Sequence, residues 1–155
     1  MASLGHYRQI FTSLQIPAPE SLTGVWQAEF VGPAWLRLSA PPALAIGGLA
    51  RWWGKEFTEP GRAINLVRRG ADLARVLPMV VTAAPSLLDG KPGISLGYPA
   101  GSPFPWPWIV DEVRQLDGHT LLCMTVVNVR WLPKLAFPFL LHPSTRAHED
   151  TPKPP

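Results

Sequence analysis

Residues 51–57 read RWWGKEF, and this stretch decides the fold. Side chains in a β-strand alternate between two faces, so Trp53, Lys55 and Phe57 would share one face. A strand that buries Trp53 and Phe57 must therefore carry Lys55 into an apolar interior or to the mouth of one. Burying an unpaired charge is costly, so we expect a partner for this ammonium group inside the fold.

The composition around this stretch limits the class of protein. The chain has 155 residues, which is enough for one domain with a sizeable core and too short for two comfortable ones. Hydrophobic residues make up 46% and charged residues 16%, so the chain is not disordered. Seven tryptophans and 19 prolines favour short strands joined by stiff loops over an all-helical domain.

Several classes of function are disfavoured. The net charge of +3 comes from scattered Lys and Arg, whereas nucleic-acid binding usually shows a clustered basic stripe. The single cysteine, Cys123, excludes an internal disulfide framework and gives no metal-site spacing. The first 20 residues lack the apolar core of a signal peptide, and prolines interrupt the longest uncharged run, at 92–110. We expect a cytoplasmic protein with no membrane span, nucleic-acid partner, metal or cofactor.

Periodicity predicts the elements in order. Residues 3–16 repeat apolar side chains at helical spacing and precede Pro17, which predicts an N-terminal helix. Strands are expected at 23–31, 51–57, 63–69, 79–82, 108–116, 119–129 and 135–141, with 34–39 as a possible extension of the first pairing. Residues 41–50 predict a short helix or an ordered loop, and 72–77 one helical turn before Pro78. Residues 143–155 are expected as a disordered tail, which leaves 1–142 as a single barrel domain.

The clearest hairpin spans residues 108–129, with an Asp-Gly turn at 117–118. Glu112 and Arg114 share a face of its first arm, most simply the solvent-facing one, and this turns Asp111 inward. The second arm is apolar on both faces, which indicates that an outer element, such as the N-terminal helix, covers the sheet.

About eight short strands with few helices predict a mainly β fold: a small, closed antiparallel barrel. A barrel of that size can hold one small ligand. A β-sandwich is the competing architecture, and it stays open at this point.

Short motifs add a resemblance. They lie at residues 24–26, 48–57, 75–79, 111–114, 117–122 and 137–141, and they cover about 21–142. Together they resemble the GXWXG-type family of small lipocalin-like (calycin-like) barrel proteins. Ala28 departs from the pattern, because it stands where the second glycine of the name would be. The family label describes a motif and implies no settled reaction; similar small barrels in natural-product pathways act as cyclases, an analogy from fold alone.

Candidate chemistry centres on Lys55 and Asp111. The usual hydrolase, phosphate-loop, dinucleotide and zinc-protease signatures are missing, the four histidines are expected at exposed positions, and Cys123 as a buried, inert thiol. Independent alternation arguments turn Lys55 and Asp111 inward. They form either a buried ion pair that fixes strand register, or a catalytic pair. In the catalytic alternative, Lys55 donates a hydrogen bond to a substrate carbonyl, and Asp111 orients Lys55 or acts as a base.

A second set of residues would contact the substrate as apolar walls or further donors. These substrate-binding candidates are Trp53, Phe57, Arg68, Tyr98, Trp106, Trp108 and Met124. Trp106 and Trp108 adjoin a proline-rich segment, 99–107, which we expect to fold over the barrel mouth. Trp26 resembles the residue that plugs the floor of a calycin barrel.

These features predict a cofactor-independent cyclase that binds an apolar polyene, terpenoid or polyketide intermediate and directs its cyclisation, with a (hetero-)Diels–Alder cycloaddition as one candidate step. Holding the reacting ends together needs little acid–base machinery. The first alternative is a non-catalytic carrier of a hydrophobic small molecule, of which a haem binder is disfavoured by the lack of an obvious axial ligand. The second is an interaction module that uses residues 99–107 as a proline-rich ligand.

Overall fold

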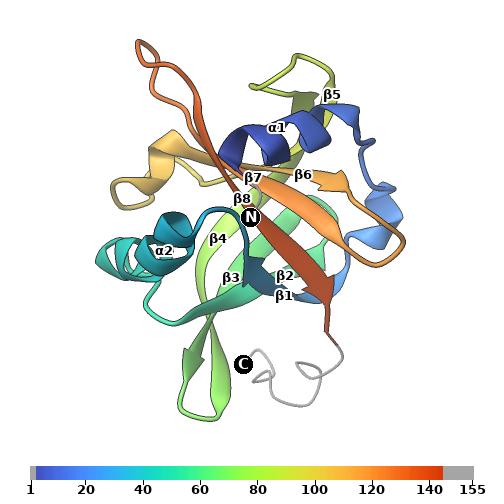
Figure 1. Ribbon diagram of the computed structural model, residues 1–155. Helices are drawn as coiled ribbons and strands as arrows, with labels where there is room; N and C mark the ends of the chain where they lie inside the picture. Colours follow the sequence, from blue (N-terminus) through green and yellow to red (C-terminus); the bar gives the residue numbers. More distant parts are fainter. Residues whose placement is uncertain (1–2, 145–155) are drawn as a thin grey trace.

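The computed structural model describes residues 3–144 and contains a closed barrel of eight antiparallel strands (Figure 1). Each strand pairs with the next in sequence, and β8 returns to pair with β1. The strands are β1 (Gly24–Phe30), β2 (Trp52–Glu59), β3 (Arg62–Arg69), β4 (Asp72–Pro85), β5 (Pro92–Gly97), β6 (Ile109–Gln115), β7 (Leu121–Val127) and β8 (Leu135–Pro143). The helices are α1 (Leu4–Ser13) and α2 (Ala34–Ile46), with 3-10 turns at Pro19–Ser21 and Trp106–Trp108. The predicted barrel is confirmed over the competing sandwich.

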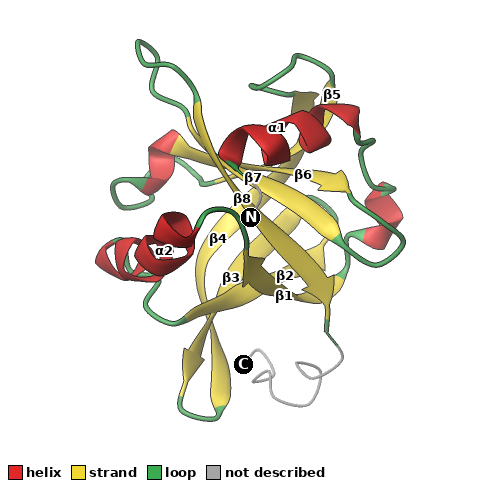
Figure 2. Ribbon diagram, in the orientation of Figure 1, coloured by secondary structure: helices red, strands yellow, loops and turns green. Residues whose placement is uncertain are grey.

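Helix α1 lies outside the barrel, across β7 and β8 (Figure 2). Ser3 caps its start, because the Ser3 Oγ accepts a hydrogen bond from the His6 backbone N–H at 3.2 Å. Phe11 is fully buried against the outward-facing side chains of β7. The predicted N-terminal helix is therefore confirmed, although it ends at Ser13, because Leu14 has extended backbone dihedrals.

Helix α2 replaces two predicted elements. Residues 34–39 do not extend the first strand; they form the first half of a helix that begins directly after Pro33. Pro41 and Pro42 lie inside this helix, and because proline is disfavoured in helix interiors, the sequence pattern moved the expected start to residue 41. The helix buries Leu36 and lies over one end of the barrel, so it closes that end in part.

The predicted helical turn at 72–77 is wrong, because β4 runs without interruption from Asp72 to Pro85. The register of β3 and β4 shifts between Ile64 and Asn65, opposite residues 76–78. Pro78 has no N–H for the ladder, and a bulge accommodates such a residue within a strand. The proline that was expected to end a helix therefore marks a bulge in a long strand.

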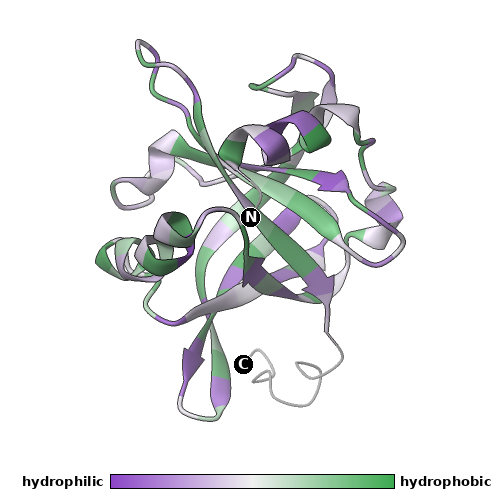
Figure 3. Cartoon of the chain, viewed as in Figure 1, coloured by the Kyte–Doolittle hydropathy of each residue, from purple (hydrophilic) through white to green (hydrophobic). Residues whose placement is uncertain are grey.

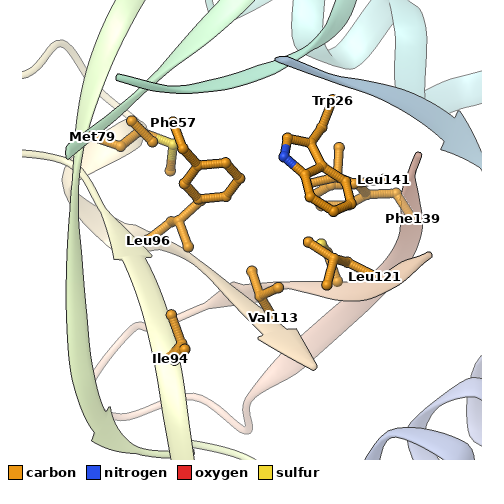
Figure 4. Packing of buried hydrophobic residues seen from close by; sticks show 11 residues of the cluster. Trp26, Phe57, Met79, Ile94, Leu96, Val113, Leu121, Phe139 and Leu141 are labelled. Carbon is orange, nitrogen blue, oxygen red and sulfur yellow. The ribbon is translucent and has the colours of Figure 1, made fainter. Parts of the chain in front are cut away.

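The end of the barrel away from α2 is filled by apolar side chains (Figure 4). The Trp26 and Phe57 rings meet edge to face there, with centroids 6.4 Å apart, and the Trp26 Nε1 donates to the Thr23 carbonyl at 3.0 Å. The Trp26 side chain from β1 and the Phe57 side chain from β2 thus close this end of the barrel, as the resemblance implied for Trp26. Phe57 belongs to this floor and does not line the cavity described below.

The outer face of β6 is covered, so the prediction that Glu112 and Arg114 face solvent is wrong. Each is only 1% exposed. The Arg114 guanidinium makes a bidentate ion pair with Asp89, at 2.6 and 2.9 Å, and donates to the Phe11 carbonyl of α1 at 2.7 Å. It also lies over the Phe11 ring, 4.3 Å from the centroid. Arg114 therefore joins α1 and the β4–β5 loop to the barrel.

The first two residues of the predicted tail, 143 and 144, are paired with the barrel. Pro143 belongs to β8, and the Ser144 N–H donates to the Val25 carbonyl at 2.8 Å. The remainder of the predicted tail, 145–155, lies outside the described residues. Within residues 3–144, neither helix has the length and apolar character needed to cross a bilayer.

Candidate functional site

A cavity of about 280 Å³ lies between the barrel interior and α2. Its volume is close to the lower end of ordinary small-molecule sites. Most of its wall is apolar and comes from α2, β1, β8 and the residues just before β6. Six lining residues are polar or charged: Ser39, Lys55, Asn65, Tyr98, Asp111 and Thr125. The cavity therefore suits a small ligand that is mainly apolar and has few polar atoms.

A bulge in β2 decides which aromatic residue faces this cavity. Trp52 pairs with Val67 and Gly54 with Leu66, so the register shifts at Trp53. Trp52 consequently lines the cavity, whereas Trp53 packs on the outside of the barrel beside Leu66. The prediction that Trp53 shares the inner face with Lys55 is wrong, because strict alternation fails at a bulge.

Close approach of two strands explains the glycine at this bulge. A Cβ atom at Gly54 would lie 2.0 Å from the Trp26 carbonyl oxygen of β1, which is far inside van der Waals contact. Only a residue without a side chain lets β1 and β2 approach in this way. Gly54 thereby places the following Lys55 over the barrel interior.

Lys55 and Asp111 form a buried ion pair, with the Lys55 Nζ 2.9 Å from the Asp111 Oδ2. Their side chains are 2% and 5% exposed, so both lie inside the barrel, as their alternation predicts. The ammonium group also donates to the Asn65 Oδ1 at 2.8 Å and to the Met79 Sδ at 3.2 Å. The other Asp111 oxygen accepts from the Thr125 hydroxyl at 2.8 Å. All three ammonium N–H groups thus have an acceptor within the protein.

The charge of Lys55 is retained in this setting. Burial is the largest single effect and acts to lower its pKa, but attraction and hydrogen bonding to Asp111, together with smaller contributions from Tyr98 and Cys123, outweigh it. The pKa of Lys55 therefore lies above its ordinary value. The ammonium also lies 5.4 Å from the centroid of the Trp52 ring and 6.0 Å from that of Phe139, which adds cation–π attraction. The cavity therefore contains a fixed positive charge that is compensated by one carboxylate.

Asn65 connects this pair to Tyr98, and the sequence prediction missed it. Asn65 is fully buried; its Oδ1 also accepts from the Trp52 Nε1 at 3.1 Å, and its Nδ2 donates to the Leu77 carbonyl at 3.0 Å and to the Tyr98 Oη at 3.1 Å. One feature of the sequence could have identified Asn65: the tight turn at residues 60–61, between the two strands. Counting outward from that turn places Asn65 opposite Lys55.

Tyr98 is the end of the polar network. Its Oη accepts a hydrogen bond from Asn65, and no described residue accepts the hydroxyl hydrogen. The ring packs against Trp106, with centroids 5.2 Å apart. Burial raises the pKa of Tyr98, and the nearby Lys55 charge opposes that rise. Tyr98 is therefore neutral near pH 7 and can donate one hydrogen bond to a molecule in the cavity.

Trp106 also lines the cavity, from the proline-rich segment. Its Nε1 donates to the Gly47 carbonyl at the end of α2, at 2.6 Å, and its side chain is buried. This contact ties residues 99–107 to α2 across the cavity. Trp108, by contrast, points away: it is 46% exposed and meets Phe104 edge to face at 5.1 Å.

Two further predicted contacts lie outside the cavity. Met124 faces α1 and packs against Phe11, because Cys123 and Thr125 take the inner face of β7. Arg68 lies on the outer face of β3 and does not line the cavity. Of the seven predicted substrate-binding residues, the structure brings Tyr98 and Trp106 into the site.

Cys123 is fully buried in the barrel interior. Burial raises its pKa well above the ordinary value, and the thiol is therefore protonated and unreactive near neutral pH. Among residues 3–144, no three His, Cys, Asp or Glu side chains gather in a group that could hold a metal ion.

Comparisons with known proteins show similarity at the level of fold. No protein-family model matches the chain, and no curated protein matches it. A crystal structure of a protein from Thermomonospora curvata superposes with a TM-score of 0.67 at 15% sequence identity, covering 92% of this chain and 88% of that one. The chain is thus an eight-stranded antiparallel barrel consistent with a calycin-like fold, and its likeness to the Thermomonospora protein extends to the fold alone.

Proposed function

We propose that the protein is a cofactor-independent cyclase of natural-product biosynthesis. Its substrate would be an apolar polyene, terpenoid or polyketide intermediate with one carbonyl group. The observation that carries this proposal is the cavity itself: an apolar chamber whose buried polar groups form one connected network ending at the unmatched hydroxyl hydrogen of Tyr98. Such a site recognises one acceptor atom on an otherwise apolar molecule.

Tyr98 is the group that we assign to the substrate carbonyl. Asn65 donates to the Tyr98 oxygen, and hydrogen bonds in such a chain polarise one another, so the Tyr98 O–H becomes a better donor. Lys55 is not the main donor to the substrate, because two of its N–H groups already bond to the strong acceptors Asp111 and Asn65. It holds Asn65, which in turn binds Tyr98. Its third N–H donates to the Met79 thioether, which is a weak acceptor. A substrate carbonyl that replaced this thioether as acceptor would therefore break only a weak hydrogen bond.

The proposed chemistry asks little of acid–base groups. In a Diels–Alder or hetero-Diels–Alder step, two σ bonds form from π bonds of the substrate and no proton leaves. Holding the reacting ends together can lower the barrier by roughly 7–11 kcal/mol in the best intramolecular cases. A donor fixed at the carbonyl adds stabilisation as electron density builds there. These two effects match an apolar cavity with a single available donor.

Chromatography combined with native mass spectrometry tests the proposal. The protein is incubated with linear polyene and quinone-methide compounds that contain a conjugated carbonyl. Because cyclisation conserves mass, a new chromatographic peak of unchanged mass is the expected product. Tyr98→Phe should lower the rate about a hundredfold while the complex still forms, since one donor is lost and the wall is kept. Trp108→Phe, outside the cavity, is the matched control.

A carrier of a hydrophobic small molecule is the second candidate function. The observation that favours it is the complete pairing of Lys55 within the protein, which is what a purely structural ion pair requires. A carrier would give a complex in native mass spectrometry with no new isomer in any compound series. Tyr98→Phe would then change affinity and nothing else.

We also propose membership of the GXWXG-type family. Gly24 opens β1 at a φ of 72°, a conformation that favours glycine, and Trp26 packs in the barrel floor. These are roles that would explain a glycine and a tryptophan two residues apart at the start of the first strand. A protein of that family with the same Gly24 and Trp26 geometry in a crystal structure would support the assignment.

A further inference from the structure

Exposed apolar side chains gather at the end of the barrel where the cavity lies. Seven of the eleven exposed large apolar residues among residues 3–144 lie on three segments: α2, the β5–β6 connection and the β7–β8 connection. The most prominent are Trp35, Leu38 and Ile46 on α2, Phe104 and Trp108 before β6, and Trp131 before β8. We call this set the apolar rim. Ile46 is 91% exposed and Trp131 79%, so these side chains have no cover in the monomer.

The barrel topology explains why the three segments share one end. In an up-and-down antiparallel barrel, every second connection emerges at the same end, which here groups the β1–β2, β3–β4, β5–β6 and β7–β8 connections. α2 and the segment before β6 lie together at the left of Figure 1, and the β7–β8 connection reaches upward on that side. A hydrogen bond from the Asn128 N–H to the Trp108 carbonyl, 2.7 Å long, joins two of the segments. Trp35 belongs to both the rim and the cavity wall.

Charge is distributed unevenly between the two ends. The rim-end connections, residues 31–51, 70–71, 98–108 and 128–134, contain four Arg or Lys residues and no Asp or Glu. The loops of the opposite end carry three carboxylates, on Glu20, Asp89 and Asp117, and one cation, Lys91. Arg51 and Arg130 are exposed, and neither forms an ion pair with a described carboxylate.

We propose that the apolar rim docks the protein on the surface of an anionic lipid bilayer. Tryptophan is favoured at the boundary between headgroups and acyl chains. The hydropathy colouring marks much of α2 as apolar (Figure 3). Arg51, Arg130 and Lys134 would lie among anionic headgroups, while an acid-free set of loops avoids repulsion. A bilayer also needs no matching shape, so it accommodates a ring of separate loops around an opening. An acidic protein surface would need such a match.

Docking in this orientation would set the cavity opening against the acyl chains. An apolar ligand could then move between bilayer and cavity without crossing water, an inference that rests on the proposed function. The docking does not rest on it, because vesicle binding is measured without any substrate. The absence of a cyclised product would therefore contradict the proposed function and leave the vesicle experiment unaffected.

Co-sedimentation with vesicles tests the docking. We expect the protein to pellet with phosphatidylcholine vesicles in which one lipid in three is phosphatidylglycerol, and to stay in solution with pure phosphatidylcholine vesicles. Salt should weaken the binding, because it screens exposed charges. Arg130→Glu should weaken partition about tenfold or more. Arg62→Glu, at an exposed site of the opposite end, lowers the net charge by the same two units and should have little effect.

The apolar part of the proposal needs its own pair of variants. Trp131→Ser should weaken vesicle binding, whereas Ile16→Ser, an exposed apolar site of the opposite end, should not. Brominated acyl chains should quench part of the tryptophan fluorescence of the wild type. In Trp131→Phe, which still binds vesicles, that quenched part should shrink.

Three outcomes would overturn the docking proposal. The first is a protein that stays in solution with anionic vesicles at low salt, which would leave an acidic protein as the occupant to seek. The second is equal loss of binding in Arg130→Glu and Arg62→Glu, which would indicate that binding depends on the net charge and that no particular end of the barrel faces the membrane. The third is unchanged binding and quenching in the Trp131 variants, which would place another face on the membrane.

Discussion

Lys55 and Asn65 face each other directly across the β2–β3 ladder, with the Lys55 Nζ 2.8 Å from the Asn65 Oδ1. The same amide group binds Trp52, Tyr98 and the Leu77 carbonyl, so every hydrogen-bonding atom of the Asn65 side chain is used. The ion pair, one cavity wall and the proposed substrate donor therefore depend on one uncharged residue. This makes Asn65 the most informative position for mutagenesis.

Asn65→Leu should lower the free energy of unfolding by about 3 kcal/mol, because the Lys55 and Trp52 donors lose their acceptor and the Tyr98 hydroxyl oxygen loses its donor. Urea denaturation measures the change. Asn128→Leu, at an exposed site, is the control and should shift stability by less than about 0.5 kcal/mol. Equal effects at the two sites would contradict the central role of Asn65.

Lys55→Met should lower the free energy of unfolding by about 3–5 kcal/mol, because the Asp111 carboxylate is left buried without its cation. Asp111→Asn added to Lys55→Met should restore part of that loss, since the amide has no charge to bury. A double-mutant cycle in urea gives the coupling energy. Additive effects of the two substitutions would show that the pair does not stabilise the fold as a unit.

Stability should depend on Asp89 in acid. Arg114 holds the pKa of Asp89 at about 2, below the ordinary value of 3.8, so the folded state favours the ionised carboxylate. The contribution, about 1–2 kcal/mol after allowing for partial exposure, is present above pH 4 and is lost as the pH falls through 2. Urea unfolding of wild type and Asp89→Asn across this range should converge in acid. A constant difference at all pH values would contradict the assignment.

Gly54→Ala should cost about 3 kcal/mol or more, because the new methyl group would overlap the Trp26 carbonyl oxygen of the neighbouring strand. Gly97→Ala is a matched control: a methyl group added at this strand-end glycine would have no atom within 4 Å, and its φ is not positive. Thermal unfolding compares the two. Equal melting temperatures for the two variants would show that the β1–β2 contact does not require glycine at residue 54.

Alternation within strands was sufficient to predict the barrel and the inward positions of Lys55 and Asp111, because both properties follow from local periodicity. It failed at Trp53, where a shift in the β2–β3 register forms a bulge that no local pattern contains. It could not place Met124 either, because both faces of that strand are apolar and only the position of α1 shows which face is outside.

Burial of polar residues was the harder property to predict. Arg114 was assigned to the correct face of its strand, but the helix and loop that cover that face come from distant parts of the sequence. Asn65 was predicted on a strand but given no role, because its role depends on Lys55 and Trp52 of β2 and on Tyr98, which follows β5. Sequence patterns indicate which face of a strand a residue occupies, but the segments that cover that face are set by tertiary contacts.

The pairing of β8 with β1, through partners such as Phe30 and Phe139, closes the barrel, so neither of these two strands is left as an open edge. The backbone groups of β1 and β8 that could template the addition of another chain are therefore already used. At this seam between the first and last strands, a second copy would meet side chains and no free ladder, so the seam does not carry the aggregation risk of an exposed hydrophobic strand.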